Sequence, residues 1–313
     1  MSIHPDLYHG EKKHQNFFEG WYFKIVDPTN KYTLALIPGI AFGENRSEHH
    51  AFVQVVNFVD FSYDYYRYPV ADFSTDKKPL QIRVANNEFS FKQISVTTKA
   101  VSGELALGEL IKWPDSKLNP GSMGFYNHFP FMECYTQVCA LDGIIKGGML
   151  NIGGRVIDFT GGRFYIEKNW GKSFPSSWIW IQSNSFPDHQ ATVTCSLGVV
   201  PMPGGYKFRG FLIGVTVDNK FYRFTTINRS SLTLNVEDHD IILYSQNKFF
   251  SLILKTKSNP DDFLQCYGPK NGKMIPYVKE TLKGTVEMTL IDKRHEVIVY
   301  HGVGENCGIE ISQ

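Results

Sequence analysis

The sequence predicts an all-β chain built from two tandem antiparallel β-barrel domains that arose by internal duplication. Its 313 residues contain many short runs of β-branched and aromatic residues, separated by turn-forming residues. No window of a dozen residues shows a helical period with capping residues. Segments of the first half also recur in the same order in the second half.

Strand signals run along the whole chain. The first two predicted strands, 21–26 and 32–37, flank the turn signal Asp27-Pro-Thr-Asn30. The other predicted strands share the same composition and lie at 51–58, 89–96, 178–182, 191–195, 211–217, 240–244, 285–290 and 296–300. Because no helical layer would cover these strands, we expect each set to close into a barrel whose interior can hold one small apolar ligand.

The two halves match at an offset of nearly half the chain. The aligned residues include Trp21 with Trp178, Glu133 with Glu280, and Glu167 with Glu310. The two glutamate pairs are 147 (280 − 133) and 143 (310 − 167) residues apart. Glycine, lysine, serine and proline interrupt the strand signals at 161–177. We therefore predict an N-terminal barrel over residues 1–165 and a C-terminal barrel over residues 166–313.

Composition excludes several classes of function. Hydrophobic residues make up 42% of the chain, which is enough for a real core, and the net charge of +1 indicates no nucleic-acid partner. The 24 Phe, 16 Tyr and 5 Trp suit strands and the walls of apolar ligand cavities. The five cysteines are scattered and form no CxxC pair, as expected for buried, reduced thiols.

Motifs for metals, nucleotides and common hydrolytic chemistry are missing from the sequence. The histidines at 49–50, 295 and 301 lack the spacing of metal ligands. There is no GxSxG, Walker loop or GxGxxG after a strand. We therefore expect neither a metal nor another cofactor.

The most specific motif is the 26-residue stretch 159–184, FTGGRFYIEKNWGKSFPSSWIWIQSN, which is rich in tryptophan and glycine. Shorter motifs accompany it at 18–24 (FEGWYFK), 113–114 (WP), 121–124 (GSMG), 129–134 (FPFMEC), 208–211 (FRGF), 222–224 (YRF) and 308–310 (GIE). Together they resemble the tocopherol cyclase family and the wider lipocalin-like group that includes carotenoid hydratases. The resemblance runs from about residue 17 to the C-terminus.

The resemblance implies a cyclisation without a redox cofactor. In that family a prenylated benzoquinol is protonated on its first side-chain double bond, and a ring hydroxyl captures the resulting tertiary cation to close a chromanol. The related hydratases protonate an isoprenoid alkene and add water. Both reactions need a strong acid in a dry pocket that tolerates a transient cation.

Four residues are candidates for the acid chemistry. An acid that protonates an alkene must be neutral, so burial must raise the pKa of its carboxyl group. Glu133 lies in an apolar, aromatic run, Glu167 lies beside a lysine, and Glu19 is the third candidate. His128 could assist as an acid or as a partner of a quinol hydroxyl, or be an ordinary loop histidine. Glu133 and Glu167 have repeat mates, which favours the alternative that they are buried structural carboxylates.

Seven residues are candidates for binding the substrate: Trp21, Tyr165, Lys168, Asn169, Trp170, Trp178 and Trp180. Lys168 and Asn169 could position the quinol oxygens, or they could be solvated turn residues. The tryptophans could stabilise a cation through their ring faces, or they could simply pack the core. Trp178 and Trp180 share one side of their predicted strand because side chains alternate along a strand.

We expect a cofactor-independent cyclase of a prenylated quinol or related isoprenoid. The alternatives are an isoprenoid hydratase and a non-catalytic carrier or sensor of such a lipid. The polar residues 1–15 show neither a secretory signal nor a transit peptide, and no stretch approaches the roughly 18 apolar residues that span a bilayer. The sequence therefore predicts a cytoplasmic protein that contacts membranes peripherally to collect a hydrophobic substrate.

Overall fold

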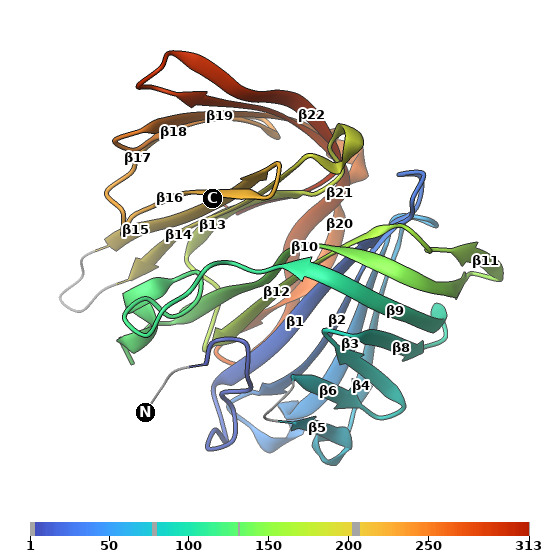
Figure 1. Cartoon of the computed structure of the whole chain (residues 1–313). Helices are drawn as coiled ribbons and strands as arrows, with labels where there is room; N and C mark the ends of the chain where they lie inside the picture. Colours follow the sequence, from blue (N-terminus) through green and yellow to red (C-terminus); the bar gives the residue numbers. More distant parts are fainter. Residues whose placement is uncertain (1–3, 77–79, 131, 202–206, 313) are drawn as a thin grey trace. The chain divides into compact units, whose positions relative to one another are not determined.

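The all-β prediction is confirmed by a computed structural model, which describes residues 4–76, 80–130, 132–201 and 207–312 (Figure 1). The described residues form 22 strands, and their only helical segments are short 3-10 turns. These turns are η1 (Arg46–Glu48), η2 (Val70–Asp72), η3 (Gly124–His128), η4 (Pro187–His189) and η6 (Pro260–Asp262). None of the described helical segments is long and apolar enough to cross a membrane.

The chain divides into two compact units. Unit 1 contains the chain up to Phe174 together with Gln265–Val278, and unit 2 contains Pro175–Leu264 together with the chain from Lys279 onward. The predicted boundary at 165/166 falls inside a strand, and the contacts place the division at 174/175 instead. The assignment of residues 265–278 to unit 1 was not predicted, because it depends on tertiary contacts alone.

Unit 1 contains a 12-stranded antiparallel sheet with the order β4-β3-β2-β1-β12-β10-β9-β8-β7-β6-β5, and β11 pairs with β10. Its strands are β1 (Phe17–Val26), β2 (Thr33–Phe42), β3 (His50–Asn57), β4 (Ser62–Tyr68), β5 (Phe73–Asp76), β6 (Gln81–Val84), β7 (Asn87–Ser90), β8 (Gln93–Thr97), β9 (Val101–Ile111), β10 (Cys134–Ile152), β11 (Arg155–Asp158) and β12 (Arg163–Gly171). The predicted strand 89–96 is a hairpin, since the Ser90 hydroxyl accepts hydrogen bonds from the backbone N–H groups of Lys92 and Gln93 and stabilises a turn.

Unit 2 is built on a 10-stranded antiparallel sheet with the order β16-β15-β14-β13-β22-β21-β19-β18-β17, and β20 pairs with β21. Its strands are β13 (Ser177–Ser183), β14 (Ala191–Pro201), β15 (Lys207–Val217), β16 (Lys220–Thr225), β17 (Ser231–Glu237), β18 (Asp240–Gln246), β19 (Phe250–Lys257), β20 (Leu264–Lys270), β21 (Lys273–Asp292) and β22 (Val297–Ser312). Most of β20 and the start of β21 belong by their contacts to unit 1.

The two sheets share one strand order, as the predicted duplication requires. The central run β4-β3-β2-β1-β12-β10-β9-β8-β7 corresponds strand by strand to β16-β15-β14-β13-β22-β21-β19-β18-β17. Each sheet packs one face around a hydrophobic core, and the aromatic residues Trp21, Phe23 and Phe89 of the first core are fully buried. Burying side chains of this kind contributes roughly 2 kcal/mol each.

Register corrects two of the predicted repeat mates. Glu167 pairs with Val138 across β12 and β10, whereas Glu310 pairs with Glu280 across β22 and β21. The structural counterpart of Glu280 is therefore Val138, and Glu133 does not occupy a duplicated position. This comparison takes Glu167 and Glu310 as equivalent positions, as the sequence predicts.

The second correction concerns the aligned tryptophans. Tyr22 pairs with Glu167 in unit 1, and Trp180 pairs with Glu310 in unit 2. Counting back one residue makes Ile179, not Trp178, the counterpart of Trp21. Ile179 and Trp21 both contribute to the hydrophobic cores of their units.

Candidate functional site

The candidate site lies on β1 and β12, which are neighbours in the sheet of unit 1. Trp21 pairs with Lys168 and Glu19 pairs with Trp170 in this ladder. Side chains alternate along both strands, so Glu19 follows Trp21 on the core-facing side of β1. The hydrophobic core thus ends in two charged residues that are both fully buried, Glu19 and Lys168.

The Lys168 ammonium has four acceptors within hydrogen-bond reach. Its Nζ lies 2.7 Å from Glu19 Oε1 and 2.9 Å from the carbonyl oxygen of Pro5. It also donates to the carbonyl oxygen of Leu7 and lies 2.9 Å from Nδ1 of His9. Burial lowers the pKa of Lys168, and the neighbouring Glu19 opposes that shift. A buried charge is tolerated only with such complete pairing.

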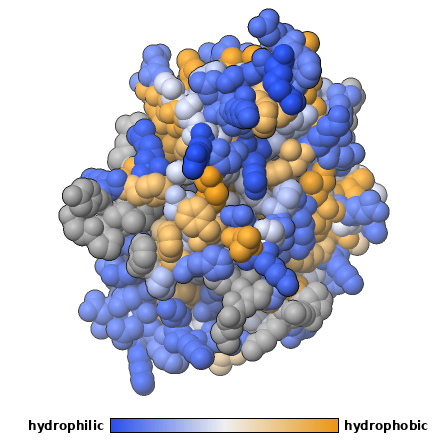
Figure 2. Space-filling model, turned by 60° about the vertical axis from the view of Figure 1, so that its left-hand side comes forward, coloured by the Kyte–Doolittle hydropathy of each residue, from blue (hydrophilic) through white to orange (hydrophobic). Residues whose placement is uncertain are grey.

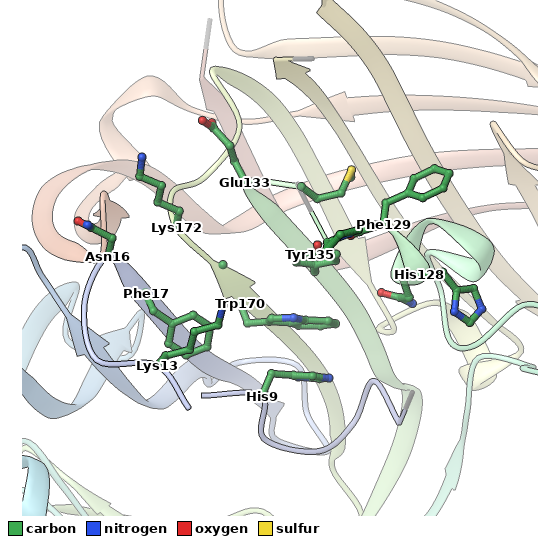
Figure 3. Close-up of a pocket in the computed structure, with 14 residues that line it drawn as sticks. His9, Lys13, Asn16, Phe17, His128, Phe129, Glu133, Tyr135, Trp170 and Lys172 are labelled. Carbon is green, nitrogen blue, oxygen red and sulfur yellow. The ribbon is translucent and has the colours of Figure 1, made fainter. Parts of the chain in front are cut away.

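Three aromatic rings form a parallel stack beside this ion pair. The His9 ring stacks on Trp170 with centroids 4.3 Å apart and an interplanar angle of 6°. Trp170 in turn stacks on Tyr135 at 5.2 Å and 10° (Figure 3). The Lys168 ammonium lies 4.5 Å from the centroid of the Trp170 ring, within the range of a cation–π contact.

A cavity of about 640 Å³ opens against this stack, within the size range of small-molecule sites. Figure 3 shows Phe17 and Lys13 on one side of the stack and His128 and Phe129 on the other. The lining residues are His9, Lys13, Asn16, Phe17, Asn127, His128, Phe129, Pro130, Met132, Glu133, Tyr135, Trp170, Gly171 and Lys172. The lining therefore combines aromatic surface with one carboxyl group and several cations or imidazoles.

Glu133 and His128 both line this pocket, as does Trp170. Glu133 is half-buried, and its side chain makes no ion pair or hydrogen bond within the described part of the chain. Figure 3 shows its carboxylate directed away from the Trp170 ring. His128 is exposed at the end of η3. These placements differ from the deep apolar burial expected for an alkene-protonating carboxyl group.

Gly171 positions the backbone of Glu133. The carbonyl oxygen of Glu133 accepts hydrogen bonds from the backbone N–H groups of Lys172, at 2.7 Å, and Ser173, at 3.3 Å. A Cβ atom on residue 171 would lie 2.2 Å from that oxygen, and the residue has a φ of +142°. Only glycine permits this close approach and this backbone conformation.

Glu167, Tyr165 and Asn169 lie on the face of β12 opposite to Lys168, and none of them lines the pocket. The Tyr165 hydroxyl donates to Glu167 Oε2 at 2.5 Å, and Asn169 Nδ2 donates to Glu167 Oε1 at 3.2 Å. Thr136 Oγ1 donates toward the same Oε1 at 2.9 Å. This network joins β12 to β10.

Trp178 and Trp180 lie in unit 2, on the side of β13 opposite to its core residues Ile179 and Ile181. The two tryptophans share one side of the strand, as predicted. The Trp178 indole donates to Glu310 Oε2 at 2.7 Å. Of the four tryptophans proposed for substrate binding, Trp170 lines the unit 1 pocket, and Trp21 contacts Lys168 from the core at 5.2 Å.

His9 and Tyr135 are pocket residues that sequence reasoning did not single out. His9 lies in the polar N-terminal stretch, and nothing local distinguishes it from the neighbouring His4 or His14. The one available signal was the adjacency of Lys168 and Trp170 on alternate positions of a strand. That spacing places both side chains on one face, where a partner for the lysine was required.

Comparisons with known proteins identify a family. The model of the "Tocopherol cyclase-like" family matches residues 92–313. The rice (Oryza sativa subsp. japonica) protein "Probable tocopherol cyclase, chloroplastic" is 26% identical over 189 residues, or 59% of this chain. This chain covers 40% of the length of that relative.

Solved structures of similar fold include CghA and a kievitone hydratase. CghA in complex with Sch210972 matches with a TM-score of 0.56 at 12% identity, over 95% of this chain and 88% of CghA. Kievitone hydratase from Nectria haematococca matches with a TM-score of 0.50 at 14% identity, over 100% of this chain and 95% of the hydratase. At this identity the likeness shows the fold alone.

Proposed function

Since the chain belongs to the tocopherol cyclase-like family, we propose that it cyclises a prenylated quinol or a related isoprenoid by acid catalysis in the unit 1 pocket. The observation that carries the proposal is the pocket itself. It combines a stacked aromatic wall, Tyr135–Trp170–His9, with a single carboxyl group, that of Glu133, among its lining residues.

The proposed reaction is an isomerisation and needs no redox partner. A proton adds to the first double bond of the prenyl chain and leaves a tertiary carbocation. A quinol oxygen attacks that cation, forms the new C–O bond and loses its proton to a base, and transfer of that proton from the base back to the carboxylate restores the acid. Glu133 is the proposed proton donor, and His128 is the proposed acceptor of the hydroxyl proton. Tyr135, at the outer end of the stack, would stabilise the cation through its ring face by roughly 0.5–2 kcal/mol.

A carrier of the same lipid is the second candidate, and one observation favours it. The Glu133 carboxylate points away from the Trp170 ring in the unliganded pocket (Figure 3). Protonation of a bound alkene therefore requires the Glu133 side chain to turn inward. A carrier needs only the aromatic wall and its polar donors.

The proposal extends to location. A prenylated quinol is insoluble in water, so the protein would collect it at a membrane surface from the cytoplasm. On the face in Figure 2, hydrophobic residues lie in small groups among hydrophilic ones. The name of the rice relative places that relative in the chloroplast. Fractionation of the source cells, with and without high salt, would distinguish a cytoplasmic, a peripheral and an organellar protein.

The test of function is an anaerobic incubation with a prenylated benzoquinol and no added cofactor. We expect a chromanol of unchanged mass, and we expect Glu133→Gln to lower kcat by about 100-fold or more. The exposed Glu109 provides the matched control, so Glu109→Gln should retain full activity. Substrate that binds but returns unchanged would favour the carrier, and a product heavier by one water would favour a hydratase.

A further inference from the structure

Polar contacts hold the N-terminal segment against strands β10 and β12 of unit 1. The carbonyl groups of Pro5 and Leu7 both accept hydrogen bonds from Lys168 Nζ. Asp6, between them, accepts a hydrogen bond of 2.9 Å from the side-chain amide of Gln137 on β10. Three consecutive residues are thus held by two strands of the sheet, and they fix the position of the residues that follow.

His9 is held from three directions. Its backbone N–H donates to Glu19 Oε2 at 2.9 Å, and its Nδ1 lies 2.9 Å from Lys168 Nζ. Its ring is stacked on Trp170. Such fixation by backbone, ring edge and ring face is typical of a residue whose orientation matters.

These contacts favour one tautomer of the His9 ring. An ammonium group has hydrogens to donate and no lone pair, so the 2.9 Å contact with Lys168 is a hydrogen bond only when Nδ1 is the acceptor. The distance from Nδ1 to Glu19 Oε1 is longer, 3.4 Å, so we take the shorter contact with Lys168 as the hydrogen bond of Nδ1. The ring hydrogen then resides on Nε2. Burial is the main cause that lowers the pKa of His9, which agrees with a neutral ring.

Nε2 of His9 has no hydrogen-bond partner among the described residues, and the ring lines the pocket with about a quarter of its side chain exposed. The neighbouring pocket wall is formed by Trp170 and Tyr135. The structure therefore presents one oriented N–H donor next to an aromatic surface. A ligand that covered this surface without an acceptor would bury that donor unsatisfied.

The duplication supplies an internal comparison. Counting from the matched pairs Tyr22–Glu167 and Trp180–Glu310, Lys168 corresponds to Ile311 and Glu19 corresponds to Ser177. The ion pair is therefore absent from the equivalent described positions of unit 2. Since unit 2 has the same fold without this ion pair, the fold does not require the pair, and we take it as a specific feature of unit 1.

We propose that His9 binds the ring oxygen of the substrate, with Nε2–H donating to a phenolic or quinone oxygen of an aromatic ring held beside Trp170. Lys168 and Glu19 are positioning residues, which hold the histidine in this tautomer. The inference rests on the proposed function in taking this pocket as the substrate site, and it assigns the group that recognises an oxygenated ring.

Isothermal titration calorimetry tests the binding role with two probes, geranylhydroquinone and geranylbenzene, which differ only in the ring oxygens. The intact protein should bind the hydroquinone at least tenfold more tightly than the hydrocarbon. His9→Phe keeps a ring for stacking but removes the donor, so it should weaken hydroquinone binding by about tenfold and leave geranylbenzene within twofold. His14→Phe, an exposed site in the same segment, should change neither affinity.

Nitrogen-15 NMR of the histidine rings tests the positioning role independently of any ligand. We expect His9 in the intact protein to be neutral with its proton on Nε2 at pH 7, and Lys168→Met to populate both tautomers. A proton on Nδ1, a charged ring, or full retention of the preference for hydroquinone in His9→Phe would overturn the proposal. If the intact protein prefers the hydroquinone but forms no chromanol, the binding role of His9 stands and the proposed cyclase activity is wrong. If His9→Phe forms the chromanol with an unchanged KM, the cyclase activity stands and the binding role of His9 is wrong.

Discussion

Replacing Lys168 with methionine tests the central ion pair most directly. Methionine preserves an unbranched apolar chain of similar length but removes the ammonium that faces Glu19. Both side chains of the pair are fully buried, and Lys168 also donates to the carbonyl groups of Pro5 and Leu7. The substitution therefore leaves a carboxylate and two carbonyl groups in the protein interior without their donor.

The expected loss follows from these contacts. Removing one partner of a buried ion pair costs about 3–5 kcal/mol, because the other charge remains desolvated. We expect the free energy of unfolding of Lys168→Met to fall by about 4 kcal/mol. For a unit of this size each kcal/mol shifts Tm by roughly 2–4 °C, so Tm should fall by about 8–16 °C.

Urea denaturation monitored by tryptophan fluorescence measures this loss, and two variants make it specific. The double variant Glu19→Gln/Lys168→Met removes both charges and keeps an oxygen for the backbone N–H of His9, so it should recover more than half of the loss. Lys255→Met breaks an exposed pair with Glu287 and should cost under about 1 kcal/mol. A loss below 1 kcal/mol for Lys168→Met, or a double variant no better than the single one, would refute the reasoning.

Two further predictions concern stability and the pocket. Burial lowers the pKa of His50 from 6.5 to about 4, and its Nε2 lies 2.6 Å from the Tyr65 hydroxyl. The unfolded chain binds the proton first as the pH falls, so this histidine should reduce the free energy of unfolding by about 3 kcal/mol between pH 6.5 and 4, and His50→Gln should remove that slope in pH-dependent urea denaturation. An identical pH profile in the variant would show that other groups titrate instead. Gly171→Ala should cost at least about 2 kcal/mol and weaken ligand binding, because its Cβ would meet the Glu133 carbonyl oxygen. Gly154→Ala, also at positive φ but with open space, should cost less and leave binding unchanged, so equal losses in both variants would refute the steric argument.

Local sequence determined the fold class of this protein. Alternating β-branched and aromatic residues, broken by turn residues, are enough to indicate strands, because side-chain direction depends only on the period of two within each run. The sequence also indicated that Trp178 and Trp180 share one side of a strand. It could not indicate which side, since aligning Trp178 with Trp21 instead of Ile179 is a slip of one residue, and such a slip reverses every side chain.

The tertiary structure decided which of the candidate residues belong together. Glu167 and Lys168 are neighbours in sequence, yet one joins a network with Tyr165 and the other pairs with Glu19, because consecutive strand residues point to opposite faces. His9 reached the pocket only because a buried lysine on a distant strand required acceptors and found them in the N-terminal segment. No local pattern encodes such a contact, since its energy comes from burying a charge among groups separated by about 160 residues.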